Sequence, residues 1–406
     1  MLLNINKKLT FRFQFFMGLF LIVTSISCGQ AKKYQSAVVM FTNVENLWDT
    51  YNSCDVIYEK YKFNDPNYRV SMEKTKAEAY IKTHQKEADS LGLKLYIDYQ
   101  TLSEEFTPES AKNWDLERYN KKLIRISEVL SNLGKQTEAK TLPVIIGLSE
   151  IENQQVVEDL INTPLLKPYN FGIVHFNSTD SRGIDVCFIY QKNRFTVTEA
   201  KKYFIDLPAD DSGYKQKTRD IVFMKGTLDG EEFGFTINHW PSRRGGEARS
   251  LPLRAKAAEV LKGIYEEQLK KNPDIKVISM GDFNDDPVSP SIKKYLKAKG
   301  DKNNLSTLDI YSPMEEKFKK GFGTLAYADA WNLFDQFFYS ANLVQTDKKF
   351  PTFKVFKTEI YSPAELIATE GQWKGYPKRS WNGDLFIEDG YSDHFPVYTV
   401  LLKEKK

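Results

Sequence analysis

The segment that decides the fold reads KVISMGDFNDDP and occupies residues 276–287. Its first five residues are mostly apolar, a pattern that predicts a buried strand. Gly281, Asp282 and Asn284 follow directly, and Asn and Asp at such positions are turn formers. Loops held at a sheet edge also commonly carry functional side chains. The segment therefore predicts a strand with a candidate chemical group at its end.

The same arrangement recurs at four other points of the chain: TNVEN (42–46), GLSE (147–150), NHWPSR (238–243) and GYSDHFP (390–396). Taken singly, Asp282 fits an ordinary loop, Glu150 a solvated carboxylate and His239 a packed core histidine. Taken together, acidic, amide or imidazole groups stand at five strand ends, with no Ser or Cys nucleophile motif and no phosphate-binding glycine loop in the sequence. Carboxylate and amide oxygens suit Mg²⁺ or Mn²⁺, so the set favours a metal site.

Short apolar runs alternate with helical patterns along the rest of the chain. We expect strands at 37–42, 142–148, 172–174, 185–190, 221–225, 234–238, 276–280, 333–339 and 397–402, and helices at 115–132 and 253–270. Many strands with few long helices indicate an α/β (α+β) sandwich in which sheet packs on sheet. Residues 50–114 are interpreted as an insertion of helix and loop, and 340–380 as a long surface segment. No linker divides the chain, so we expect a single domain over 29–406.

Composition narrows the class of protein. Of 406 residues, 41% are hydrophobic and 14% aromatic, which is enough for a large core and excludes a disordered chain. Lys and Arg number 57 against 54 Asp and Glu. Three of the cations, Lys7, Lys8 and Arg12, lie in a candidate leader, and without them the balance is 54 against 54. A neutral chain argues against a protein that coats duplex nucleic acid.

Residues 1–28 have the layout of an export signal, with a basic start, an apolar stretch and small residues before Cys28. This is typical of a bacterial lipoprotein whose cysteine is lipidated, although Ser25 stands where an aliphatic residue is usual. The expected location is therefore lipid-anchored in the bacterial cell envelope, or secreted or periplasmic if Cys28 is not lipidated. Cys54 and Cys187 remain, and a disulfide between them is left open. Cys187 lies in an apolar run, which favours a buried thiol in a strand.

The ordered set of motifs resembles the endonuclease/exonuclease/phosphatase superfamily. The residues that carry the resemblance are Asn43, Glu45, Glu150, Asn238, His239, the run Gly281-Asp282-Phe283-Asn284 and the run Ser392-Asp393-His394. It extends from about Val38 to Leu402. The resemblance implies a deoxyribonuclease-I-like, four-layer sandwich of two central mixed β-sheets flanked by helices. It also implies metal-dependent cleavage of phosphate esters.

The resemblance assigns a role to each matching position. It implies a Mg²⁺ (or Mn²⁺) site made of Glu150 as principal ligand, Asn43 and Glu45 in support, and Asp393 beside them. Glu45 stands where many members have Asp. It implies that His394 is the base, that Asp335 orients it, and that Asp282 and Asn284 position the nucleophile and hold a phosphate oxygen. The remaining matches are His239 and Asn238 as a phosphate-binding pair, Arg182 as a phosphate-gripping residue and Asp185 as a histidine-supporting one.

These assignments predict a phosphodiesterase or nuclease, with DNA or RNA among its possible substrates. The alternatives are a phosphomonoesterase, a lipid (sphingomyelinase-like) phosphodiesterase, or a non-catalytic surface lipoprotein that binds a partner. Arg243, with Arg244, Arg249 and Arg254, is expected either to place positive charge beside the scissile phosphate or to form a solvated loop. The membrane is another expected partner, through the N-terminal lipid. The protein is expected to be a monomer.

Overall fold

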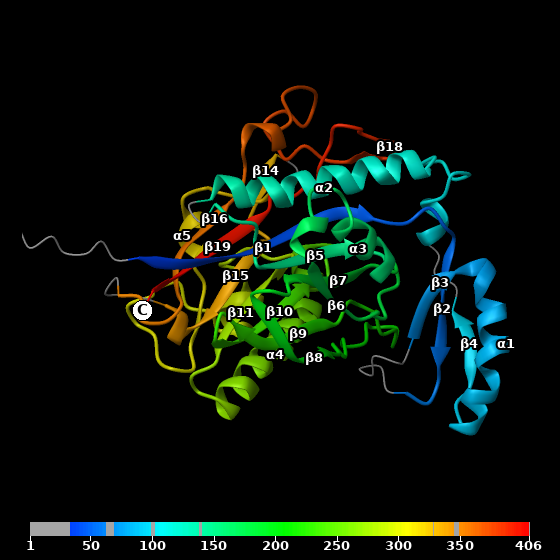
Figure 1. Cartoon of the computed structure of the whole chain (residues 1–406), viewed down its shortest axis with the longest axis horizontal. Helices are drawn as coiled ribbons and strands as arrows, with labels where there is room; N and C mark the ends of the chain where they lie inside the picture. Colours follow the sequence, from blue (N-terminus) through cyan, green and yellow to red (C-terminus); the bar gives the residue numbers. More distant parts are fainter. Residues whose placement is uncertain are drawn as a thin grey trace, which may run out of the picture. The chain divides into compact units, whose positions relative to one another are not determined.

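The computed structural model describes residues 33–61, 69–98, 102–137, 140–327, 329–344 and 349–405, and Figure 1 shows their arrangement within the unit Tyr34–Lys406. Cys28 and the candidate leader lie outside the described residues. Among the helices of the described part, none is both long and apolar enough to cross a membrane.

Two six-stranded sheets form the centre of the described chain. The first has the order β16-β19-β1-β5-β7-β6. Its strands are β1 (Tyr34–Leu47), β5 (Ile145–Ile151), β6 (Phe171–His175), β7 (Asp185–Gln191), β16 (Lys354–Ile360) and β19 (Val397–Glu404). The second has the order β12-β15-β11-β10-β9-β8. Its strands are β8 (Phe195–Tyr203), β9 (Ile221–Leu228), β10 (Glu231–His239), β11 (Lys276–Asp282), β12 (Ile310–Tyr311) and β15 (Asp335–Ser340).

Alternating side chains pack the two sheets against each other. Along β1, Val39 and Phe41 join the apolar core between the sheets, while Val38 and Met40 point to the opposite face. Gly147 of β5 permits the closest approach, because a Cβ there would lie 2.8 Å from Ile237 of the other sheet. The sheets therefore meet face to face, as the sequence predicts.

Helices cover the two outer faces, which completes the predicted four-layer sandwich (Figure 1). α2 (Leu116–Gln136) and α3 (Gln154–Ile161) bury apolar side chains against the first sheet, and α4 (Glu247–Lys271) buries its own against the second. Asp115 and Asn153 start α2 and α3 by accepting hydrogen bonds from the first-turn amides.

Strand direction brings the polar clusters to one edge. In each sheet the central pair is parallel, β1 with β5 and β10 with β11, so their carboxyl ends lie together. The neighbours β15 and β19 are antiparallel to β11 and β1, so their amino ends lie at that same edge. Asp282 at the end of β11 consequently stands opposite Asp335 at the start of β15.

Two expectations about the inserted segments are wrong in part. Residues 50–114 contain three strands besides a helix: β2 (Ser53–Tyr58), β3 (Arg69–Glu73) and β4 (Leu95–Asp98) form a small sheet packed on α1 (Lys74–Ser90). Residues 340–380 include β16, which pairs with β19 at the edge of the first sheet. Short strands have weak sequence patterns, and pairing with a neighbour stabilises them.

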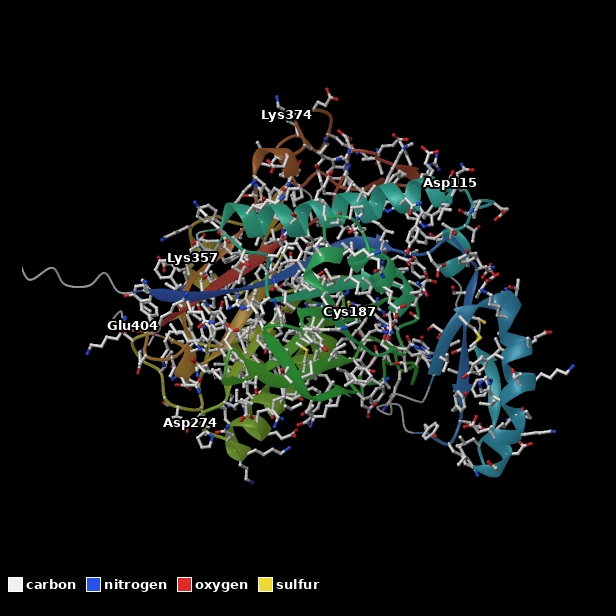
Figure 2. The ribbon with its side chains drawn as sticks, in the orientation of Figure 1. Asp115, Cys187, Asp274, Lys357, Lys374 and Glu404 are labelled. Carbon is white, nitrogen blue, oxygen red and sulfur yellow. The ribbon has the colours of Figure 1, made fainter. Side chains whose placement is uncertain are left out.

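The remaining elements are short. They are the helices η1 (Leu102–Glu105), η2 (Lys167–Tyr169), η3 (Ser291–Leu296), α5 (Met314–Lys319), η4 (Ala341–Leu343) and η5 (Ala364–Leu366), and the strands β13 (Leu325–Tyr327), β14 (Ala330–Asn332), β17 (Trp381–Asn382) and β18 (Leu385–Phe386). Cys54 and Cys187 are buried free thiols, and Cys187, labelled in Figure 2, lies in β7 as its apolar run predicts. Burial raises the pKa of Cys54 to about 11.

Candidate active site

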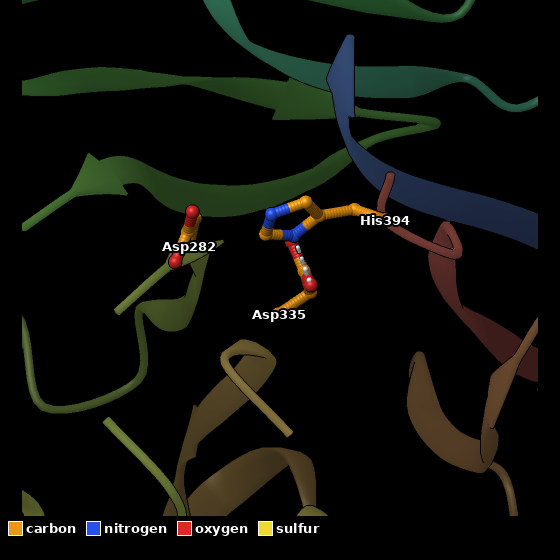
Figure 3. A group of neighbouring side chains, drawn as sticks. All are labelled: Asp282, Asp335 and His394. Carbon is orange, nitrogen blue, oxygen red and sulfur yellow. Dashed lines mark hydrogen bonds and ion pairs between the residues drawn. The ribbon is translucent and has the colours of Figure 1, made fainter. Parts of the chain in front are cut away.

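His394 and Asp335 form a hydrogen-bonded pair at the shared edge of the sheets (Figure 3). His394 Nδ1 donates to Asp335 Oδ2 at 2.8 Å, and both residues are buried. Burial opposes protonation of His394, but the charge and hydrogen bond of Asp335, with Asp393 and Asp282, outweigh it and raise the pKa of His394 well above its usual value. A carboxylate on Nδ1 also fixes the tautomer whose Nε2 can accept a proton.

Asp282 lies beside this pair. Its Oδ1 accepts a hydrogen bond from the Asn284 amide at 2.9 Å, and its Oδ2 accepts one from Asn43 Nδ2 at 3.2 Å. Burial, with the nearby charge of Asp335, raises the pKa of Asp282 to about 6, although His394 opposes that shift. Gly281, just before it, has no room for a side chain, because a Cβ would lie 2.2 Å from the Asn238 carbonyl oxygen. The position of Asp282 thus depends on that glycine.

His239 enters the site from the end of β10. Its Nε2 lies 3.7 Å from Asp282 Oδ2 and 4.0 Å from Glu150 Oε1, while its buried Nδ1 has no hydrogen-bond partner among the described residues. Burial, with the charges of Arg219 and Arg182, lowers the pKa of His239 well below its usual value. A neutral imidazole in this position can donate a hydrogen bond to a phosphate oxygen or ligate a metal.

Glu150 and Arg182 form an ion pair in the site. Arg182 donates to Glu150 Oε1 at 3.4 Å and to Asn46 Oδ1 at 2.7 Å, and its side chain remains 40% exposed. Glu45, Asn46, Glu150 and Asn284 all have positive φ, between 50° and 65°. Left-handed backbone is uncommon for residues other than glycine, and such strain clusters at functional sites.

Asn43 of β1 links the end of β11 to the loop that carries Ser392. Its Oδ1 accepts from the Glu45 amide at 2.9 Å, its Nδ2 donates to Asp282, and its carbonyl accepts from Ser392 at 2.8 Å. Asp393 is half-buried, with Oδ1 3.9 Å from His394 Nε2, and it binds Arg379 at 3.2 Å. Of the residues expected to bind a metal, Glu150 therefore lies near His239, Asp393 near His394, and Asn43 against Asp282.

Glu45, expected as a supporting metal ligand, uses its carboxylate to bind backbone amides. Its carboxylate accepts hydrogen bonds from the amides of Ser380 and Trp381. Lys122 of α2 donates to the Glu45 carbonyl at 3.1 Å. Burial, with the charge of Asp393, raises the pKa of Glu45 to about 8, while burial lowers the pKa of Lys122 to about 8. Glu45 thus holds the loop before β17.

Asn238 and Asp185 also make internal contacts. The Asn238 amide donates to Thr236 and to the Met280 carbonyl, both at 3.1 Å, and its Oδ1 accepts from Trp240. Asp185 binds a histidine that sequence reasoning missed, His175, at 3.0 Å. Asn284 donates to the carbonyl of Trp240 at 2.9 Å. The Asn238 side-chain amide uses both of its donors inside the protein, and the Asp185 carboxylate binds His175 and accepts from the Ser178 amide, so both residues support the loops that carry the site.

Four arginines were expected either to place charge beside the scissile phosphate or to form a solvated loop, and two of them, Arg243 and Arg254, instead bind groups of the protein itself. Arg243 donates to Asp285, Asp286 and Ser289, and its guanidinium lies on the Phe334 ring. Arg254 is fully buried and pairs with Asp285 at 2.7 Å. Two buried cations that the sequence did not single out, Arg219 and Lys122, likewise bind backbone carbonyls near the site. Arg243 and Arg254 are therefore structural, because their donors are used inside the protein.

One group of potential metal ligands among the described residues includes the hydrogen-bonded pair of His394 and Asp335. Ligand atoms of Asp282, Asp335 and His394 lie within 4.8 Å of one another. The hydrogen bond between His394 and Asp335 already uses Nδ1 and Oδ2, so a metal on those atoms would have to break it. Glu150 and Asp393, the carboxylates expected as ligands, are outside this group, and both are partly accessible.

A sequence model described as the endonuclease/exonuclease/phosphatase family matches residues 96–403, a range that begins after Asn43 and Glu45. No match was found among curated proteins. Among solved structures, an endonuclease/exonuclease/phosphatase family protein from Bacteroides thetaiotaomicron is 13% identical, with 92% of this chain and 97% of that chain covered and a TM-score of 0.47. The human nocturnin catalytic domain is 18% identical over 72% and 88%, with a TM-score of 0.43. A mannosyl-6-phosphatase from Bacteroides thetaiotaomicron is 14% identical over 70% and 93%, with a TM-score of 0.43.

Proposed function

Because the chain belongs to the endonuclease/exonuclease/phosphatase family, whose members are phosphoester hydrolases, we propose that it is a Mg²⁺-dependent phosphodiesterase that uses His394 to activate water. The observation that carries this proposal is the hydrogen bond from His394 Nδ1 to Asp335. It leaves Nε2 to accept a proton from a water aimed at phosphorus.

The donor set fits a divalent hard cation. Glu150, Asn43 and Asp393 would supply oxygen atoms, and His239 Nε2, which lies 4.0 Å from Glu150 Oε1, would supply a nitrogen. When bound, the metal would supply positive charge for the phosphoryl oxygens. Mn²⁺ has the same ligand preference and is expected to substitute.

The chain's own side chains would complete the stabilisation of the transition state. Arg182, whose side chain is 40% exposed, lies beside Glu150. His239 is neutral and can donate one hydrogen bond to a phosphoryl oxygen. Preorganised donors of this kind typically contribute about 2.7–4 kcal/mol each to lowering the barrier. Asp282 orients Asn43 and the Asn284 loop and lies against His394.

We propose a small phosphodiester rather than long nucleic acid as the substrate. Arg243 and Arg254 donate to carboxylates of the same protein, which removes two cations from the basic surface that a long polyanion would need. A phosphomonoesterase is the second candidate, because Arg182 and Arg379 could bind the extra charge of a terminal phosphate. A lipid phosphodiesterase and a non-catalytic binding protein are the remaining alternatives.

The test is hydrolysis of bis-p-nitrophenyl phosphate, p-nitrophenyl phosphate, plasmid DNA and sphingomyelin by the purified protein, with Mg²⁺, Mn²⁺ or EDTA. We expect metal-dependent release of p-nitrophenol from the diester. Glu150→Gln keeps the shape of the side chain but removes a charge that holds the cation, so it should raise the Mg²⁺ concentration needed for half-maximal rate. Full turnover in EDTA would refute the metal assignment. Failure to hydrolyse any of these substrates would refute the catalytic assignment.

We further propose that the protein is exported and anchored by lipid on Cys28, on the sequence pattern of residues 1–28. Cys28→Ser should move it from the membrane fraction to the soluble exported fraction. An unchanged membrane fraction would point to an uncleaved anchor. A soluble wild-type protein would point to ordinary signal cleavage.

A further inference from the structure

α2 carries one charged side chain on its buried face. Lys122 is the only charged residue among the buried residues that the structure describes on this helix, and it has no exposed surface. It stands three positions after Tyr119 and four before Ile126, on the face that packs against the first sheet (Figure 1). Taking a charged group out of water costs several kcal/mol, which good hydrogen-bond geometry has to offset. The partners of Lys122 therefore decide what it does.

The Lys122 ammonium donates to three segments that are far apart in the sequence. Its Nζ donates to the Glu45 carbonyl at the end of β1, at 3.1 Å, and to the Ser380 hydroxyl in the loop before β17. It also donates to the Tyr391 carbonyl in the loop before β19, at 3.3 Å. An ammonium has three N–H donors, so all of them are used. Ser380 Oγ donates to the same Tyr391 carbonyl at 2.8 Å, which joins two of the three segments directly.

The segment that begins at Tyr391 carries His394. Ser392 follows Tyr391, and its hydroxyl accepts a hydrogen bond from the His394 amide at 3.1 Å. The same hydroxyl donates to the Asn43 carbonyl at 2.8 Å. The backbone that leads to His394 is thus bound to β1 through Ser392 and to α2 through Lys122. From this backbone the His394 imidazole reaches Asp335, 2.8 Å away.

Lys122 cannot take part in the reaction directly. Its side chain is fully buried and its three donors are used inside the protein, so none is left for a substrate. Its effect on catalysis would therefore pass through the segments that it holds. Small displacements of a catalytic group are costly, since a misplacement of about 1 Å can lower a rate by about 10²-fold.

We propose that Lys122 is a positioning residue, which holds the Tyr391 carbonyl and so aligns the His394 imidazole with Asp335 and with the water that it activates. The effect on rate rests on the proposed function. The effect on the hydrogen bond between His394 and Asp335 does not, because that bond is present without substrate.

The first test compares two buried lysines. Lys122→Met keeps the length and packing of the side chain but removes its three donors. Lys276→Met is the control, because Lys276 is also buried and pairs with a carboxylate, that of Glu231 at 2.9 Å. Lys276 is the first residue of β11, at the opposite end of the strand from Asp282. Urea unfolding measures the loss of stability in both variants.

We expect Lys122→Met to lower kcat for bis-p-nitrophenyl phosphate by roughly tenfold or more, with little change in KM. Lys276→Met should lose stability but keep kcat. An unchanged kcat in Lys122→Met would overturn the proposal, and so would an equal loss of kcat in Lys276→Met.

The second test repeats Lys122→Met in a protein that already carries His394→Ala. If Lys122 acts through His394, the substitution should cause almost no further loss of kcat in that background, because residues that act together give non-additive losses. A merely structural role would lower the folded fraction, and with it the rate, by the same factor in both backgrounds. Equal factors would therefore refute the positioning role.

A third measurement separates this proposal from the proposed function, because it needs no turnover. NMR of the histidine rings observes the Nδ1 proton that His394 shares with Asp335, and His394→Ala identifies this signal among the four histidines of the chain. The signal should be kept in Lys276→Met and shifted or lost in Lys122→Met. If the wild type hydrolyses no ester, the proposed function fails, and this signal still decides the role of Lys122.

An unchanged His394 signal in Lys122→Met would refute the proposal. If Lys122→Met does not fold, Ser380→Ala replaces it as the milder variant, because it removes the hydroxyl that bridges Lys122 and the Tyr391 carbonyl. Ser380→Ala should shift the same signal and lower kcat by a smaller factor. No change in either quantity would overturn the proposal.

Discussion

At the residue scale, His394 and Asp335 should act as one unit. His394→Ala removes the group that accepts the proton and should lower kcat by about 10²–10⁴-fold. Asp335→Asn keeps the imidazole but removes the carboxylate that orients it, so its loss should be smaller. The double variant should be scarcely slower than His394→Ala, because residues that work together give non-additive losses. Steady-state kinetics of the three variants test this, and fully additive losses would place the base elsewhere, with His239 the next candidate.

The pH dependence of activity follows from the same pair. Asp335 raises the pKa of His394, so the imidazole becomes neutral, and able to accept a proton, only at a pH above the usual histidine value. The acidic limb of kcat/KM should therefore have its midpoint above about 6.5. Asp335→Asn removes the main cause of the raised pKa and should move this limb to lower pH. A limb that stays in place in Asp335→Asn would contradict the assignment.

At the scale of elements, α4 is tied to the loop after β11 by the buried pair of Arg254 and Asp285. Arg254→Ala removes one of the two cations that pair with the buried Asp285 carboxylate, the other being Arg243. Breaking a buried ion pair typically costs about 3–5 kcal/mol of unfolding free energy, and the remaining arginine should keep the loss at or below the lower end of that range. Urea unfolding should show this loss, and Asp285→Ala added to it should restore part of the stability. Arg249→Ala, at an exposed position of the same helix, is the control.

The same experiment separates two interpretations of the arginine-rich segment. If Arg254 bound substrate, its replacement would raise KM and leave stability unchanged. We expect the opposite, because its guanidinium has no exposed surface and donates to Asp285, Ser250 and the Glu247 carbonyl. A rise in KM with unchanged unfolding would overturn the structural role.

At the scale of the whole molecule, a bound cation should stabilise the fold. A ligand that binds only the native state at 100 times its Kd adds about 2.7 kcal/mol to the unfolding free energy. Mg²⁺ should therefore raise Tm, and EDTA should reverse the rise. Calorimetry of Glu150→Gln should show a smaller rise, whereas Glu117→Gln, an exposed substitution on α2, should respond like wild type. Equal responses in both variants would remove Glu150 from the metal site.

The sequence by itself determined the sheets, the outer helices α2 and α4, and the edge at which the polar clusters meet. β11 is buried at every position, so its sequence is a mostly apolar run that is visible without any alternation. A change from apolar to polar residues marks where the strand leaves the core, so Asp282, Glu150 and His394 could be placed at strand ends. The small sheet, β8 and β16 were not predicted, since edge strands carry mixed apolar and polar side chains.

Only the tertiary structure decided which of these side chains bind one another. Asp335 and His394 are 59 positions apart in the sequence and 2.8 Å apart in space. Glu45 binds the amides of Ser380 and Trp381, and Arg254 pairs with Asp285, although the sequence suggested a metal and a phosphate as their partners. Local pattern records whether a position is buried, because burial acts on each residue separately. The partner of a charged group depends on which opposite charge and which donors the fold brings within about 4 Å, and the pattern does not contain that information.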